Sequence, residues 1–415
     1  MSSRRIFIKN SALAMFGLGS VPAWLTRAVF AKDGPGQRKK ILIAIFQRGA
    51  VDGLNVVIPH GEAAYYAMRP SIAIPRPNGN ENSAIDLDGH FGLHPALRSL
   101  KPLWDQKQLA IVEAVGSPDP TRSHFDAQDY MESGTPGLKA TSDGWLNRAL
   151  CREPKPSALR AISVGADLPR SLRGKNEALA LNSIGDFQVK DARAASIFES
   201  MYGASADRVL NGTARETFDA VRIMQSIQKT PYTPSNNAHY PNGKLGQGLL
   251  QIARLIKADV GLEVAFTDVG GWDTHVNEVG PQPHVGQLAN LLREFGGAIA
   301  AFSNDMGDRM QDITLVTMSE FGRTVRENGN RGTDHGHANY MFVLGGKVRG
   351  GCVHGEWPGL ATEQLYEGRD LKVTTDFRSV LSQVVQIQLG NRELEAVFPG
   401  FRAQETAPGR MPLFS

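Results

Sequence analysis

Short, unbroken apolar runs alternate along this 415-residue chain with longer segments that are apolar on one face only. Such short runs, bounded by turn residues, are typical of strands buried on both faces. Strands separated by helices pack as a parallel sheet with helices on its two faces. The sequence therefore predicts an α/β fold with a doubly wound, mainly parallel sheet. The predicted strands are Ile41–Phe46, Leu109–Val115, Arg160–Val164, Leu262–Thr267, Ile313–Thr317 and Met341–Leu344.

Three segments repeat large apolar residues at the spacing of one helix face, around 97–104, 245–256 and 288–302. We expect residues 38–415 to form one domain, with Ile41–Phe46, Leu262–Thr267 and Ile313–Thr317 as its central strands. Residues around 155–245 are less regular, and we interpret them as a partly helical elaboration. Helices are expected there between Ala192 and Gln228.

Residues 1–31 have the composition of an export signal. Arg4-Arg5 precede an apolar stretch that ends in Val29-Phe30-Ala31, a sequence typical of a signal-peptidase site, and the paired arginines resemble a twin-arginine signal. Four of the 45 basic residues lie there, which leaves 41 basic against 42 acidic residues. A near-neutral remainder argues against nucleic acid as a partner. No later segment reaches about 18 consecutive apolar residues, so we expect a periplasmic protein that is not integral to the membrane.

Carboxylates and histidines recur directly after the predicted strands. Because the carboxyl ends of parallel strands meet at one edge of a sheet, these side chains are expected to share a site. The two cysteines, whose pairing stays open, exclude a Cys-rich metal site, whereas Asp, Glu and His suit Zn²⁺, Mn²⁺ or Mg²⁺. The candidate metal ligands are Asp52, Asp273, His275, Glu320, Asp334, His335 and His337, and the cysteines are Cys151 and Cys352.

Three further residues at the same edge are candidates for catalysis. Ser123 is a candidate nucleophile, and it also suits the N-cap of a helix over His124–Met131. The two roles are compatible, since a helix N-terminus favours an anion beside it. Arg122 and Arg323 are candidates for binding an anionic substrate group. The chain has no P-loop, no dinucleotide fingerprint after a strand and no Gly-x-Ser-x-Gly elbow.

Seven motifs and the Arg-Arg signal together resemble a known bacterial group. The motifs are RGAVDGLN, FGLHPAL, TRSHFDAQDYME, GGWDTH, TMSEFGRT, GTDHGHAN and HGEWPGL. They resemble the exported proteins of domain-of-unknown-function family 1501 over residues 38 to about 400. That family is similar, more distantly, to the alkaline phosphatase and sulfatase superfamily. The resemblance implies an alkaline phosphatase-like fold and a metal-dependent site for phosphate or sulfate esters.

The resemblance also implies roles for single residues. Asp52 falls near the superfamily's first metal-binding Asp, though several residues late. Ser123 or Thr121 falls at the nucleophile, and Asp273 with His275 at a later Asp and His. The next Asp-His pair of the superfamily has two alignments here. It corresponds either to Glu320-Phe321, with His335 or His337 as the further ligand, or to Asp334-His335 after a long loop. In the first alignment Phe321 replaces one ligand of a two-metal centre.

Two functions are compatible with these observations. The first is an exported, metal-dependent hydrolase of phosphate or sulfate esters, acting on a small anionic ester or an envelope polymer with Ser123 as nucleophile. The second is a non-catalytic exported protein that keeps the fold and one metal, and binds a co-exported protein or an envelope polymer. For either, we expect the side-chain ends of Asp273, His275, Asp334 and His335 to converge within about 6–8 Å. Ser123 should point into the same cleft, bordered by Asp52 or Glu320.

Overall fold

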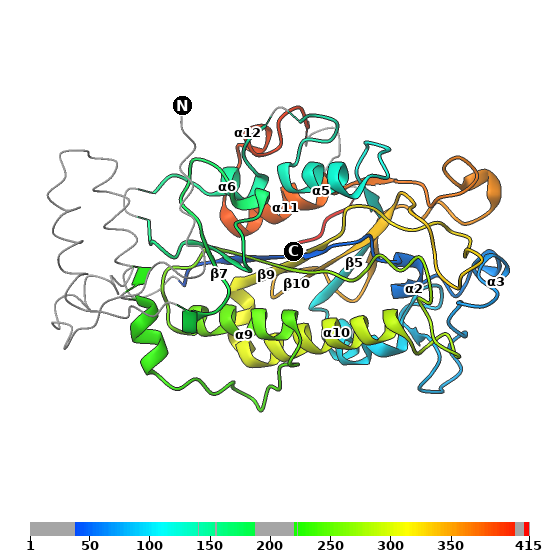
Figure 1. Ribbon diagram of the computed structural model, residues 1–415, viewed down its shortest axis with the longest axis horizontal. Coiled ribbons are helices and arrows are strands. Elements are labelled where there is room, and N and C mark those ends of the chain that lie inside the picture. The colour runs from blue at the N-terminus through cyan, green and yellow to red at the C-terminus, as the bar shows by residue number, and fades with distance from the viewer. Residues whose placement is uncertain are drawn as a thin grey trace, which may run out of the picture.

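The predicted α/β organisation is confirmed, because helices cover both faces of one mainly parallel sheet (Figure 1). The computed structural model describes residues 38–139, 141–153, 156–186, 220–221, 223–402 and 411–414. The predicted export signal lies outside these residues. So does most of the span between Ala192 and Gln228 in which helices are expected.

The centre of the sheet consists of the three strands that the sequence places there. β1 (Ile41–Gln47) pairs in parallel with β8 (Val264–Val269) on one side and with β9 (Ile313–Met318) on the other. Ile43 lies opposite Ala265 and Leu315 in these two ladders. All seven residues of β1 are buried, as expected for a strand with helices on both faces.

The outer strands complete the order β11-β5-β10-β9-β1-β8-β6-β7, and β12 also pairs with β5. Among the described strands of this sheet, β10 (Asn339–Gly345) alone runs opposite to its neighbours, pairing antiparallel with both β9 and β5. The carboxyl ends of β1, β5, β8 and β9 therefore share one edge. The remaining strands are β5 (Leu109–Gly116), β6 (Ala161–Val164), β7 (Leu179–Leu181), β11 (Val353–His354) and β12 (Thr375–Asp376).

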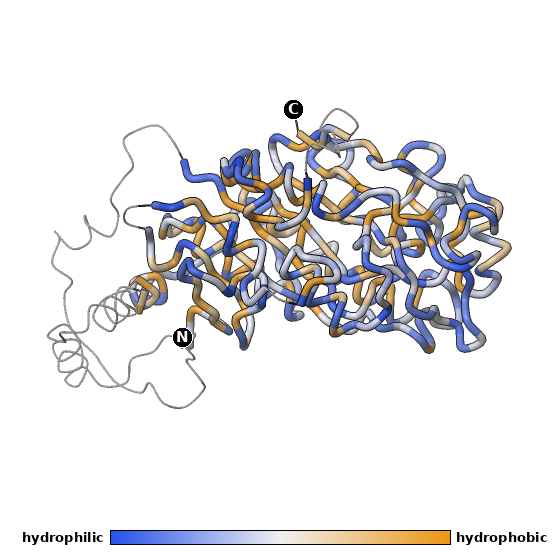
Figure 2. The backbone as a smooth tube through the Cα atoms, turned by 90° about the horizontal axis from the view of Figure 1, so that it is seen from above, coloured by the Kyte–Doolittle hydropathy of each residue, from blue (hydrophilic) through white to orange (hydrophobic). Residues whose placement is uncertain are grey.

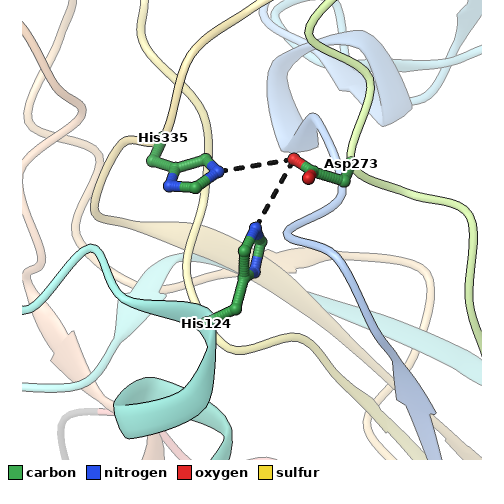
Figure 3. Close-up of side chains that lie close together, drawn as sticks. All are labelled: His124, Asp273 and His335. Carbon is green, nitrogen blue, oxygen red and sulfur yellow. Dashed lines mark hydrogen bonds and ion pairs between the residues drawn. The ribbon is translucent and has the colours of Figure 1, made fainter.

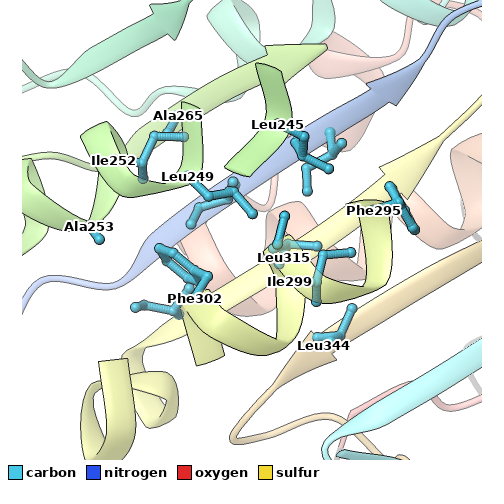
Figure 4. Packing of buried hydrophobic residues seen from close by; sticks show 14 of the residues in the cluster. Leu245, Leu249, Ile252, Ala253, Ala265, Phe295, Ile299, Phe302, Leu315 and Leu344 are labelled. Carbon is cyan, nitrogen blue, oxygen red and sulfur yellow. The ribbon is translucent and has the colours of Figure 1, made fainter. Parts of the chain in front are cut away.

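Two long helices cover one face of the sheet, and their apolar stripes are the ones predicted from the sequence. They are α9 (Lys244–Lys257) and α10 (Gln287–Met306), and the shorter η1 (Pro95–Leu100) and α4 (Lys101–Asp105) belong to the same layer. Figure 4 shows side chains of α9 and α10 packed over the strands. The labelled residues are Leu245, Leu249, Ile252, Ala253, Phe295, Ile299 and Phe302 from the helices, and Ala265, Leu315 and Leu344 from the strands.

The opposite face is covered by four helices, namely α5 (His124–Ser133), α6 (Trp145–Ala149), α11 (Phe377–Val384) and α12 (Leu394–Val397) (Figure 1). Seen from above, the hydrophilic colour is frequent along the outer loops, and hydrophobic stretches run through the middle (Figure 2). The shorter elements are α2 (Gly53–Val56), α3 (Ala63–Met68), η2 (Arg170–Leu172), η3 (Ile184–Asp186), η4 (Gly307–Asp312), η5 (Thr362–Gln364) and the π-helix η6 (Val385–Leu389), with a small sheet of β2 (Val57–Ile58), β4 (Gly92–Leu93) and β3 (Ile85–Asp86).

Cys151 and Cys352 are free, exposed thiols, so no disulfide joins them. The part of the chain that the structure describes contains no helix with both the length and the apolar character needed to cross a bilayer. The predicted strand boundaries hold to within two residues. The largest differences are at β8, which is Val264–Val269 instead of Leu262–Thr267, and at β10, which begins at Asn339 instead of Met341.

Candidate metal centre

Three loops at the carboxyl edge of the sheet bring histidines and an aspartate together. The loop after β5 ends at His124, the first residue of α5. The loop after β8 carries Asp273 and His275, and the long connection between β9 and β10 carries His335. Figure 3 shows the rings of His124 and His335 directed at the carboxylate of Asp273. The predicted convergence of residues far apart in the sequence is therefore observed.

One carboxylate oxygen lies at the middle of this group. Asp273 Oδ1 is 3.5 Å from His124 Nε2, 3.1 Å from His275 Nε2 and 3.4 Å from His335 Nε2. The Nε2 atoms of His275 and His335 are 2.9 Å apart. Ligands of a tetrahedral zinc ion, at bonds of about 2.0–2.1 Å, lie roughly 3.3 Å from one another. The ligand atoms of His124, Asp273 and His335 all lie within 4.8 Å of one another, so these three side chains could hold a single divalent ion. His275 lies beside this group, next to Asp273 and His335.

The other nitrogen of each ring bonds to an oxygen. His124 Nδ1 is 2.8 Å from Glu320 Oε1, His275 Nδ1 is 2.9 Å from Asp334 Oδ1, and His335 Nδ1 is 2.9 Å from the carbonyl oxygen of Arg122. Carboxylate and carbonyl oxygens accept hydrogen bonds, so Nδ1 carries the proton and each neutral ring keeps a lone pair on Nε2. This is the arrangement by which proteins orient metal-binding histidines. The two Nε2 atoms of His275 and His335 lie at hydrogen-bond distance, and with the protons on Nδ1 both lone pairs would be free to bind a cation.

The electrostatics of the group keep the carboxylates ionised. Burial opposes ionisation of Glu320, but hydrogen bonds from His124 and Gln128 hold the pKa of its carboxyl below the usual value. Burial likewise opposes ionisation of Asp273, and the hydrogen bond from Arg323 lowers the pKa of Asp273 overall. Burial, with the nearby positive charges, lowers the pKa of His335, so this ring is neutral near pH 7. The hydrogen bond to Glu320 raises the pKa of His124.

Ser123 occupies the predicted N-cap of α5. Its Oγ accepts a hydrogen bond of 3.5 Å from the backbone N–H of Asp126. The residues on either side of it belong to the site, since the Arg122 carbonyl holds His335 and His124 faces Asp273. The serine thus lies next to the histidine cluster, and its role as nucleophile stays a prediction.

Both predicted substrate-binding arginines hold protein oxygens in this structure. Arg323 is buried and donates to Asp273 Oδ1 at 2.6 Å and to four backbone carbonyls. Arg122 donates through Nε and Nη2 to Asp370 and through Nη2 to Glu367. Arg323 therefore fixes the position of Asp273. The four carbonyls that it holds are those of Gly49, Ala50, Trp272 and Thr333.

The other predicted ligands divide into two groups. Glu320 and Asp334 lie behind the histidines and hold His124 and His275 through Nδ1, as described above. Asp52 and His337 contact other partners. Both carboxylate oxygens of Asp52 bond to buried Arg69, at 2.5 and 2.9 Å. His337 bonds through Nε2 to the carbonyl oxygen of Ser117, and its ring packs against Tyr366.

Phe321, which replaces a superfamily ligand in one alignment, packs under the cluster. Its ring centroid lies 5.0 Å from that of His124 and 5.1 Å from that of His335. The Phe321 ring covers the side of the His124 and His335 imidazoles that it packs against, and limits the access of water there. The residue pair Glu320-Phe321 therefore supports the ligand rings with a carboxylate and an aromatic side chain.

His124 is the site residue that the sequence analysis did not predict as a ligand. In the sequence it reads as the first residue of a helix capped by Ser123. A side chain in the first turn of a helix that starts at a strand's carboxyl end is directed toward the shared edge. His124 could therefore have been predicted as a site residue from this position and from its neighbours Arg122 and Ser123, which were already candidates.

The family described as "Protein of unknown function (DUF1501)" matches residues 39–397 of the chain. No curated protein matches it. Among solved structures, the C-terminal periplasmic domain of EcEptC from Escherichia coli in complex with Zn is 11% identical, with a TM-score of 0.35 over 76% of this chain and 74% of that chain. A second crystal structure of that domain gives 10% identity, a TM-score of 0.37 and 89% coverage of both chains. The lipoteichoic acid synthase LtaP from Listeria monocytogenes gives 10% identity and a TM-score of 0.29, over 78% and 71%.

Proposed function

The chain belongs to the DUF1501 family of proteins of unknown function, and we propose that it is an exported, metal-dependent hydrolase of phosphate or sulfate esters. The observation that carries the proposal is the convergence of three histidine Nε2 atoms on Asp273 Oδ1, with each Nδ1 held by an oxygen. Export is proposed from Arg4-Arg5 and the apolar stretch after them, with the periplasm as destination.

His124, His275, His335 and Asp273 would hold the ion. Three imidazole nitrogens suit Zn²⁺ or Mn²⁺ better than Mg²⁺, which prefers oxygen ligands. A bound divalent ion would polarise an ester oxygen and lower the pKa of a hydroxyl or water beside it. The side chains of Asp273 and His275 are 48% and 38% exposed, so the centre is open to a substrate from solvent.

The residues around the ligands would hold the centre in place. Arg323 fixes Asp273, Glu320 fixes the tautomer of His124, and Phe321 shields the rings from below. Ser123 would supply the attacking oxygen to the phosphorus or sulfur atom, the ester's alcohol would leave, and water would then release phosphate or sulfate and restore the serine hydroxyl. Its place at the N-terminus of α5 supports that role, because the free backbone N–H groups there stabilise a negative charge.

The test begins with metal analysis of protein exported through its own signal. We expect one divalent ion per chain, and hydrolysis of 4-nitrophenyl phosphate or 4-nitrophenyl sulfate that stops with a chelator and returns with the ion. Ser123→Ala should abolish hydrolysis and leave the metal bound. Thr121→Val is the matched control, since Thr121 is the other candidate nucleophile. Metal-loaded protein that hydrolyses neither ester would contradict the hydrolase.

A non-catalytic exported protein is the second candidate, and one specific observation favours it. The guanidinium groups of Arg122 and Arg323 already hold protein oxygens, whereas an ester hydrolase needs donors directed at the substrate anion. Such a protein would keep one metal and bind a co-exported protein or an envelope polymer. It predicts bound metal without ester hydrolysis, and recovery of a cross-linked exported partner from the periplasm.

A further inference from the structure

A single buried carboxyl group lies between the two loops that supply most of the ligands. Glu278 follows His275 by three residues and is fully buried. Its Oε2 accepts hydrogen bonds from Thr274 Oγ1 at 3.0 Å and from Thr333 Oγ1 at 3.1 Å. Thr274 separates Asp273 from His275, and Thr333 precedes Asp334 and His335. One oxygen atom of Glu278 therefore joins both ligand-bearing loops.

The backbones of the two loops are joined at the same place. Thr333 N donates to the Thr274 carbonyl at 3.3 Å, and Glu278 N donates to the Arg331 carbonyl at 3.0 Å. Gly332 allows this approach, because a Cβ atom there would lie 2.4 Å from the carbonyl oxygen of His275. The loops thus meet over several residues. Besides the contacts of His275 with Asp334 and His335, the Glu278 carboxyl group is a buried side chain that bonds to both loops.

The far side of Glu278 is anchored to the loop after β1. Its Oε1 accepts from Asn55 Nδ2 at 3.2 Å. Burial, followed by the negative charge of Asp52, raises the pKa of Glu278 well above the usual value. A carboxyl group that keeps its proton can stay buried beside Asp52, whose own charge is paired with Arg69. Arg69 in turn donates to the carbonyls of Thr324 and Val325.

We infer that Glu278 is a positioning residue that clamps the Asp273–His275 loop to the Asp334–His335 loop and so sets the spacing of the ligand atoms. The clamp rests on the proposed metal centre and extends it by naming what holds the ligands together. Asp52 contacts none of the proposed ligands His124, Asp273, His275 and His335. Through Glu278 it belongs to the buried polar network behind the metal centre.

The experiment compares Glu278→Ala with Glu278→Gln in the full chain. Two quantities are measured: the Kd for Zn²⁺, by competition with a chromophoric chelator, and amide hydrogen exchange of residues 273–278 and 328–335 in metal-free protein. Glu278 reaches the ligands only through Thr274 and Thr333. Glu278→Ala should therefore raise the Kd by about 10-fold, the low end of the effect of losing a group bonded to a metal ligand, and speed exchange in both loops. Glu278→Gln keeps an oxygen for the two threonines and should restore most of the affinity.

Asp305→Ala is the matched control. Asp305 is also a buried carboxylate that holds a loop, accepting from Tyr232, Tyr240 and the backbone N–H of Ser235. It lies about 25 Å along α10 from Leu288, whose N–H bonds to the Glu278 carbonyl. We expect Asp305→Ala to lower the melting temperature and leave both the Kd and the exchange of the two ligand loops unchanged.

Each outcome decides the inference. Equal losses of thermal stability in Glu278→Ala and Asp305→Ala, with wild-type Kd and loop exchange in both, would overturn it. If Glu278→Ala does not fold, Thr274→Val and Thr333→Val decide, since each removes one bond to the clamp: a raised Kd supports it and an unchanged one refutes it. If the wild-type protein binds no Zn²⁺, the proposed function fails, and loop exchange in the metal-free variants alone decides the clamp.

Discussion

Replacing Arg323 by methionine should destabilise the protein by about 3–4.5 kcal/mol, because three buried backbone carbonyls would lose their donor. The side chain is fully buried and donates five hydrogen bonds. Four go to backbone carbonyls in three loops of the carboxyl edge, and the fifth goes to Asp273. Methionine keeps most of the apolar volume of the stem, so the change removes mainly the donors.

The magnitude follows from the acceptors left behind. A buried acceptor without a partner costs about 1–3 kcal/mol. The Asp273 side chain is 48% exposed and regains water, so it is counted as zero. The Trp272 carbonyl still accepts the N–H of Thr274 and is also counted as zero. The other three carbonyls, at the low end of the range of about 1–1.5 kcal/mol each, give about 3–4.5 kcal/mol. Total stabilities of domains are about 5–15 kcal/mol, so the loss would be a large part of the whole.

Urea denaturation of the metal-free variant and wild type measures this difference from the midpoint and slope. Arg98→Met is the matched control, because Arg98 is an exposed arginine with one bond to the Glu81 carbonyl, and it should change stability by less than about 0.5 kcal/mol. If Arg323 instead bound a substrate anion, Arg323→Met would lose less than about 1 kcal/mol and raise KM. That result would refute the reasoning.

Three further outcomes are expected. Replacing Arg4 and Arg5 by lysines should leave the precursor in the cytoplasm, and an unchanged periplasmic yield in cell fractionation would contradict the twin-arginine signal. His124→Ala should lower the metal bound per chain, measured by mass spectrometry of the elements, whereas His337→Ala should not, because that ring contacts Ser117 and Tyr366; equal losses would count against the ligand set. Burial raises the pKa of Glu113 well above 4.5, so the stability that its protonated form contributes is complete below that value and is lost as pH rises through the folded-state pKa. Glu113→Gln, which is neutral at every pH, should flatten this decline in thermal melts, and parallel curves would disprove it.

Most of the sheet could be predicted because a strand that is buried on both faces has mainly apolar residues on both faces, which is visible in the sequence. Ile41–Phe46 is an unbroken apolar run, Ile313–Thr317 is apolar apart from Thr314 and Thr317, and both are central strands. The direction of β10 could not be predicted, since an apolar run such as Met341–Leu344 reads the same in both directions. Its antiparallel pairing follows from the connection after β9, which returns to the sheet without a crossover helix.

The candidate site was predictable where a residue's position alone decides its role. Asp273, His275 and His335 follow strands that share an edge, and the structure brings them together. Asp52 has the same kind of position. Asp52 differs from them because its carboxylate is paired with the guanidinium of Arg69, which follows α3. No local sequence pattern predicts this contact. Pairing of buried charges is a tertiary property, so the sequence could not separate a ligand from an ion-pair partner.

The residues that a second metal ion would require are already occupied. The sequence resemblance would assign such an ion to Asp52, which holds Arg69, and to Glu320-Phe321. Glu320 accepts from His124, Gln128 and the Gly49 N–H through Oε1, and from Ser319 through Oε2. To bind an ion, Glu320 would have to give up these donors, and Asp52 would have to leave a buried arginine unpaired, which costs about 3–5 kcal/mol. For the proposed metal centre this arrangement favours one ion, because the two buried carboxylates already hold other partners and the half-exposed Asp273 stays available to an ion.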